Sequence, residues 1–288
     1  MTTTASGGPT VRRILVGAQL RRLRESAGIT REQAGYRIRA SESKISRLEL
    51  GRVSFKDRDV NDLLELYGVT EGVEREALIT MAREANSPGW WHGYDDVLPN
   101  WFQTYIGLEE AASLIRTYEV QFVPGLLQTE DYCRAVITSG QADAPVEEVE
   151  RRVNLRLTRQ KLLSREESPG RLWAVVDEAA LRRPMGGRKV MRSQLQHLLD
   201  LMETKTVTVQ IMPFRFGGHA AEGGPFSILR FPDAELQDLV YVEQLVGALY
   251  IERKDQVERY VQTFERLTVD SQQPDHSMES LHKILTQV

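Results

Sequence analysis

Several features that define secreted and membrane proteins are absent from this 288-residue chain. Its only cysteine, Cys133, excludes an intramolecular disulfide and suits a reducing cytosol, where we expect it to be a small buried residue. No apolar run approaches the roughly 20 residues that span a bilayer. Residues 1–10 are small and polar, in contrast to a signal peptide, and we expect residues 1–9 to be disordered. The sequence therefore predicts a cytoplasmic protein.

Sequence signatures of catalysis and of metal binding are also missing. The five histidines form neither His-Glu-x-x-His nor a Cys/His metal spacing, and no Gly-x-x-x-x-Gly-Lys phosphate loop is present. We therefore predict no catalytic residue, no metal and no cofactor, and we do not expect an enzyme. The best alternative constellation, with two carboxylates that could meet near one sheet edge, is Glu178, Arg182, Arg183, His219 and Glu243. An Arg–Glu pair that ties a loop to the sheet is the competing interpretation.

The most informative pattern that is present lies in residues 30–49. Thr30 and Gln33 have the spacing of a capping box, and Ser41 is a good N-cap for the next helix. Apolar residues at helical spacing predict the inward faces of these two helices: Ala34, Ile38, Ile45 and Leu48. Two short helices joined by a tight turn are the arrangement of a helix-turn-helix, whose second helix enters the DNA major groove.

Three further helices complete the predicted domain. The first covers about residues 12–27 and stops at Gly28, the fourth ends at Gly68, and the fifth covers about residues 71–86. A break at residues 86–89 then separates a DNA-binding domain, residues 10–86, from a regulatory and dimerisation domain, residues 87–288.

The outward face of the second helix carries side chains that can read DNA: Glu42, Ser43, Lys44, Ser46 and Arg47. Arg and Lys donate to guanine, Ser pairs with several base edges, and Glu accepts from cytosine. Residues 12–58 hold 13 Lys/Arg against 5 Asp/Glu, a net charge of +8, although the whole chain has a net charge of −4. A basic block in an acidic protein favours DNA binding over a purely protein-binding helical domain.

The segment from Ile45 to Gly51, Ile-Ser-Arg-Leu-Glu-Leu-Gly, together with the preceding cap, resembles the Cro/CI-type helix-turn-helix of the xenobiotic-response-element family. The resemblance implies five helices and a dimer on operator DNA. It implies phosphate or positioning contacts for Arg31 and Gln33 and base contacts for the outward residues above, and Arg52 completes the predicted set. The family usually has glycine in the turn where this chain has Arg39, and a positive φ there would cost about 1 kcal/mol.

Helices and strands alternate in the predicted second domain. Helices are expected at about residues 108–118, from Thr129, and over residues 145–164. The apolar stripe of the last helix suits either the core or a dimer seam and consists of Val146, Val149, Val153 and Leu157. Strands are expected at 172–176, 206–211, 226–231 and 240–242. Further helices are expected at about 190–203, 256–267 and 276–286. The predicted fold class is α+β, mostly helical, with a small mixed or antiparallel sheet.

An aromatic cluster, residues 90–105, follows the break between the domains. It is either a ligand or partner site or a hydrophobic wedge that fixes one domain against the other, and the wedge is the favoured interpretation. The candidate ligand or partner residues of the second domain are Trp91, Trp101, Glu178, Arg182, His219 and Glu243.

Four stretches, starting at Pro88, Pro124, Asp177 and Tyr241, resemble the C-terminal antitoxin-like domain of uncharacterised function found in WhiJ-type actinobacterial regulators. Such regulators are often encoded beside a very small protein. The predicted function is a sequence-specific, nucleoid-associated regulator, a dimeric repressor whose second domain senses a small molecule or a small protein. The alternative is an enzyme or ligand-processing domain that carries a DNA-targeting module.

Overall fold

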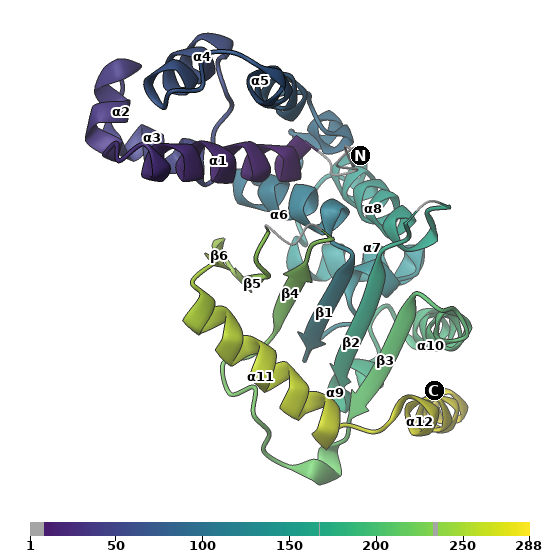
Figure 1. Cartoon of the computed structure of the whole chain (residues 1–288). Coiled ribbons are helices and arrows are strands. Elements are labelled where there is room, and N and C mark those ends of the chain that lie inside the picture. Colours follow the sequence, from purple (N-terminus) through teal and green to yellow (C-terminus); the bar gives the residue numbers. More distant parts are fainter. Residues whose placement is uncertain (1–8, 167, 233–235) are drawn as a thin grey trace. The chain divides into compact units, whose positions relative to one another are not determined.

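The computed structural model describes residues 9–166, 168–232 and 236–288, without the side chains of residues 9, 11 and 100 (Figure 1). The predicted disorder of residues 1–9 lies outside the described residues, apart from Pro9, which begins the first helix. The chain divides into two compact units. One holds the described residues up to Gly93 together with Ile106–Ala111 and Leu236, and the other holds the rest. The predicted boundary after residue 86 stays a prediction.

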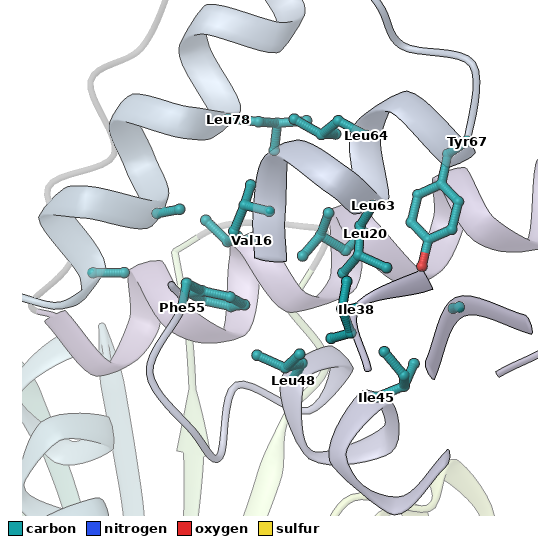
Figure 2. Close-up of a cluster of buried hydrophobic side chains, with 14 residues drawn as sticks. Val16, Leu20, Ile38, Ile45, Leu48, Phe55, Leu63, Leu64, Tyr67 and Leu78 are labelled. Carbon is teal, nitrogen blue, oxygen red and sulfur yellow. The ribbon is translucent and has the colours of Figure 1, made fainter. Parts of the chain in front are cut away.

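The helical bundle of the first unit consists of α1 (Pro9–Ser26), α2 (Arg31–Arg37), α3 (Glu42–Glu49), α4 (Asp57–Leu66) and α5 (Val73–Ala85). All five were predicted from apolar spacing and caps. Their inward faces meet in one core, in which Figure 2 labels Val16, Leu20, Ile38, Ile45, Leu48, Phe55, Leu63, Leu64, Tyr67 and Leu78. Because each helix contributes to this core, the apolar faces fix where α3 lies within the unit.

Side-chain caps begin the two helices of the predicted helix-turn-helix. Thr30 Oγ1 accepts from the backbone N–H of Gln33, and the Gln33 side chain accepts from the backbone N–H of Thr30. Ser41 Oγ accepts from the backbone N–H of Lys44. These bonds satisfy N–H groups that have no partner within the helix, and they confirm the predicted capping box and N-cap.

Gly17 marks a close crossing of two backbones, α1 and α3. A Cβ added to this residue would lie 2.5 Å from the carbonyl oxygen of Leu48 and 2.7 Å from that of Glu49. Backbone atoms cannot yield as a flexible side chain can, so only glycine lets the two helices approach this closely.

A six-stranded mixed sheet forms the centre of the second unit. Its order is β3-β2-β1-β4-β5-β6, in which β1 to β3 are parallel and β4 to β6 are antiparallel to their neighbours. The strands are β1 (Leu114–Glu119), β2 (Arg171–Asp177), β3 (Val207–Met212), β4 (Phe226–Arg230), β5 (Leu239–Gln244) and β6 (Gly247–Ile251). The predicted α+β class is confirmed, with a larger sheet than expected.

Helix α11 (Lys254–Asp270) lies across one face of the sheet (Figure 1). Its Val257, Phe264 and Leu267 pack against Tyr118, Val175 and other buried strand residues. Helix α12 (Pro274–Gln287) covers the β3 edge, where Ser277 Oγ accepts from the Ile211 N–H at 3.0 Å. The remaining helices are α6 (Asn100–Ala111), α7 (Glu130–Gly140), α8 (Val146–Gln160), α9 (Glu178–Arg182) and α10 (Arg188–Met202).

Four short 3₁₀ segments join these elements: η1 (Trp90–Tyr94), η2 (Gly125–Leu127), η3 (Lys161–Ser164) and η4 (Phe214–Phe216). Several elements differ from the sequence prediction, among them α9, which was not predicted. The helix expected at residues 108–118 is wrong, because α6 ends at Ala111 and β1 begins at Leu114. Strand β6 was not predicted at all.

Candidate nucleic-acid interface

Helix α3 separates an inward face from an outward face. Ile45 and Leu48 are buried in the core, whereas Glu42, Ser43 and Arg47 are exposed and Ser46 is half-buried. The outward side chains therefore form a polar row that a major groove can accept. Among them, the guanidinium of Arg47 has no intramolecular partner in the described part of the chain.

Glu49 lies on the inward face of α3 and joins three segments of the domain. Its carboxylate accepts from Arg24 on α1 at 2.5 Å and 3.1 Å, and from Arg31 at the start of α2 at 3.1 Å. The hydrogen bond with Glu49 raises the pKa of Arg24 above its ordinary value. Because Glu49 is buried, this network holds the N-terminus of α2 and the C-terminus of α3 in register with α1. The sequence analysis had not identified this role.

Two of the cations predicted to contact DNA form ion pairs with carboxylates of the same chain. Lys44 Nζ lies 2.7 Å from a carboxylate oxygen of buried Asp59, and Arg31 belongs to the Glu49 network. Arg31 and Lys44 can reach a phosphate or a base only with their remaining donors. Arg52 also has an interaction within the protein. Gln33 uses its side-chain oxygen in the cap, which leaves its amide N–H groups for a phosphate.

Arg39 occupies the turn between α2 and α3 with φ of 54°. The left-handed conformation that the missing glycine suggested is therefore present, at a cost of about 1 kcal/mol. Its exposed side chain lines an open hollow that also contains exposed Tyr36. The residues around this hollow are Ile29, Glu32, Gln33, Tyr36, Arg37, Arg39, Ala40, Ser41 and Leu66. The hollow thus adjoins the predicted phosphate contact of Gln33 and the N-cap of α3.

The candidate ligand residues of the second unit are held in separate local contacts. Glu178 forms an ion pair with Arg182 at 2.6 Å and accepts from the Phe214 N–H. The His219 ring bonds to the Tyr118 hydroxyl at 2.8 Å, and Glu243 accepts from the Tyr241 hydroxyl at 3.1 Å.

The expected meeting of Glu178 and Glu243 at one sheet edge is wrong, because β1 and β4 separate β2 from β5. Trp91 is buried and packs edge-on against Trp90, while the Trp101 carbonyl accepts from the Tyr250 hydroxyl at 2.6 Å.

The described residues contain no group of three or more His, Cys, Asp or Glu that could hold a metal ion. No helix in the described ranges has the length and apolar character needed to cross a membrane.

Two family models match separate parts of the chain. Residues 15–78 match the model of a helix-turn-helix domain, and residues 102–283 match that of a domain of unknown function, DUF5753. The second match covers more than half of the sequence. The chain belongs to the DUF5753 family. Searches of curated proteins and of solved structures returned no significant match.

The two family matches indicate which kind of function the chain has. The helix-turn-helix domain supports a DNA-binding regulator and favours a regulator over an enzyme. The DUF5753 domain contains the whole sheet together with α7 to α11. The combination is consistent with the predicted regulator of the xenobiotic-response-element type.

Proposed function

We propose that this DUF5753 protein is a sequence-specific transcriptional repressor that binds operator DNA as a dimer and releases it in response to an effector. The observation that carries the proposal is α3, whose outward row of polar side chains ends in the unpaired guanidinium of Arg47. The DNA-contacting set is Arg31, Gln33, Glu42, Ser43, Lys44, Ser46, Arg47 and Arg52. In this proposal residues 10–86 bind DNA on the nucleoid, and residues 87–288 dimerise and sense the effector, a small molecule or a small protein.

DNA affinity is expected to fall steeply as salt rises, because the +8 block at residues 12–58 neutralises phosphates and releases counterions. The slope of log K against log salt should be about −0.9 for each phosphate contact. Fluorescence anisotropy with fragments selected from genomic DNA measures this slope on the full chain. A salt-independent affinity would contradict a DNA-binding role for this face.

Arg47→Ala is expected to cost about 1–3 kcal/mol at the base pair that Arg47 reads and to relax the sequence preference there. Arg58→Ala is the matched control, because Arg58 is an exposed cation of α4 whose nearest acidic partner is Asp62 at 3.7 Å. Binding is measured on the selected operator and on single-base variants. Equal losses for Arg47→Ala on every sequence would mean that Arg47 contacts only phosphate.

The full chain is expected to be a dimer at micromolar concentration. One helix-turn-helix reads a half-site, and two half-sites about 34–36 Å apart would multiply the specificity. Exposed Val146 on α8 and Val269 on α11 are apolar residues of the second unit that an interface could cover. Light scattering on the full chain and on residues 10–86 tests both the oligomeric state and the location of the dimer interface. A full chain that stays monomeric with and without DNA would refute the dimer. A dimeric 10–86 fragment would show that the interface lies in the first domain and not in residues 87–288.

A further inference from the structure

The strand order of the sheet turns at β1. The chain passes from β1 to β2 and β3 on one side and then returns to β4 on the other side. Sheets with parallel strands often bind ligands beyond the carboxyl ends of those strands, and β1 and β2 are parallel here. Glu119 is the last residue of β1, so this position carries a carboxylate.

A second carboxylate lies on the same face of the sheet. Thr117 pairs with Ser227, and Ser227 pairs with Tyr241 on β5. Glu119 and Glu243 each follow two residues later and therefore share the face of this row. Burial and, to a lesser extent, the nearby charge of Glu243 raise the pKa of Glu119, Arg156 opposes them, and the pKa is about 8.

Arg156 brings a guanidinium from α8 to these carboxylates. Its Nη1 donates to Gln128 Oε1 at 2.8 Å, and its charge lies near the Cys133 thiol. Burial lowers its pKa. In the described part of the chain, no carboxylate lies within ion-pair distance of Arg156, and no cation lies within that distance of Glu119. Glu119 and Arg156 are half-buried and Glu243 is exposed, and these opposite charges stay apart.

Aromatic rings and a loop surround this set of charges. The Arg159 guanidinium stacks over Phe102 at 5.0 Å and over Tyr105 at 5.6 Å. The Tyr105 ring is 4.1 Å from the Tyr241 ring. Gly125 of η2 lies beside both arginines, since a Cβ there would be 3.9 Å from Arg156 Cδ and from Arg159 Nη1. The stretches that begin at Pro124 and Tyr241, which the DNA-binding function does not explain, thus converge here.

We propose that the charge cluster, defined as Glu119, Glu243, Arg156 and Arg159, binds a small zwitterionic molecule of the free amino acid class. Its carboxylate would accept from Arg156, and its ammonium group would donate to Glu119 and Glu243. The two glutamates would repel a dianion, and the two arginines would repel a dication. A zwitterion carries one charge of each sign, so it can neutralise charges of both kinds. This inference rests on the proposed function, for which it names the class of effector.

The test uses the full chain and each proteinogenic L-amino acid separately, with thermal unfolding and titration calorimetry as measurements. We expect at least one amino acid to raise the melting temperature, because a ligand of the native state stabilises it. Its analogues without the amino group or without the carboxylate should not do so. Binding near neutral pH should also release a proton from Glu119, so the measured heat should change with the ionisation enthalpy of the buffer.

Glu119→Gln and Arg156→Gln should each weaken this binding by about tenfold or more. Arg152→Gln is the matched control on the same helix, because Arg152 pairs with Glu148 outside the cluster, and it should bind as the unmodified chain does. If Arg156→Gln fails to fold, Arg156→Lys replaces it. Lysine keeps the charge but cannot form a bidentate hydrogen bond, so this variant should also bind the amino acid more weakly.

The proposal is overturned if no amino acid shifts the melting temperature, if the variants bind as tightly as the unmodified chain, or if only dianions bind. DNA binding measured in parallel separates the two proposals. A chain that binds DNA but no amino acid refutes only the inference about the cluster, and one that binds an amino acid but no DNA refutes only the proposed function.

Discussion

Replacement of Glu49 by alanine is expected to lower the free energy of unfolding of the N-terminal unit by about 3–5 kcal/mol, because it leaves two arginines without their shared carboxylate. Arg24 is buried, and Arg31 is partly buried against α3. A small domain has only about 5–15 kcal/mol of total stability. The variant should therefore populate unfolded forms and lose DNA affinity, although Glu49 lies on the inward face of α3.

Glu25→Gln is the control for this substitution. Glu25 lies 3.3 Å from the same Arg24 guanidinium, but its side chain is 53% exposed. Exposed ion pairs contribute at most about 1 kcal/mol, so this variant should unfold close to the unmodified chain. Urea unfolding followed by circular dichroism compares the two variants, and similar losses of stability in both would contradict the structural role of Glu49.

Glu119→Gln is expected to stabilise the second unit increasingly as pH rises from about 5 to about 8. Glu119 has a pKa of about 8 in the folded protein, above its ordinary value of 4.5. A carboxyl with a raised folded pKa contributes stability that is present below the unfolded pKa and is lost as pH rises toward the folded pKa. The loss is on the order of 5 kcal/mol at most, and glutamine removes it.

The groups that face Glu119 are Glu243 on β5, Arg156 on α8 and Tyr132 on α7. Thermal unfolding across this pH range compares Glu119→Gln with Glu148→Gln, whose carboxylate pairs with Arg152 outside the cluster. The difference between the Glu119→Gln variant and the unmodified chain should be small at pH 5 and greatest above pH 8. A difference that does not change with pH would contradict the raised pKa.

Local signals were sufficient to predict the first unit. Its caps, its apolar spacing and the stop at Gly28 each depend on residues only three or four positions apart. The pairing of Glu49 with Arg24 and Arg31 joins residues 25 and 18 positions apart, so no local pattern indicates it. The sequence predicted an outward row on α3, but it could not show that Lys44 pairs with Asp59.

The sheet was harder to predict because its strands differ in environment. Central β1 is buried on both faces, including Arg116, so it lacks the alternation of a half-buried strand and reads as a continuation of the preceding helix. Edge strand β6 is short and mostly half-buried, which gives little contrast between its faces. By contrast, β3 alternates in sequence, and it was predicted to within one residue.

The charge cluster had one sequence signal that was not used. The apolar stripe of α8 was assigned to Val146, Val149, Val153 and Leu157, but Val146 is 76% exposed. The inward face instead continues from Val149 and Val153 to Arg156 and to buried Arg159. Charged residues that extend an inward helical face indicate a functional or paired role, and this signal would have identified the cluster.

The crossing at Gly17 links the sequence of α1 to the way α3 can meet DNA. Because the α1 backbone lies against Leu48 and Glu49, any side chain at residue 17 must push the C-terminal turn of α3 outward or tilt the helix. Arg47 is adjacent to this contact, so a rotation of α3 would change which base pair it reaches. Related proteins with alanine or serine at this position would then differ in operator preference even with an identical α3 sequence. Under the proposed function, operator specificity would therefore depend partly on a buried residue outside the outward row of α3.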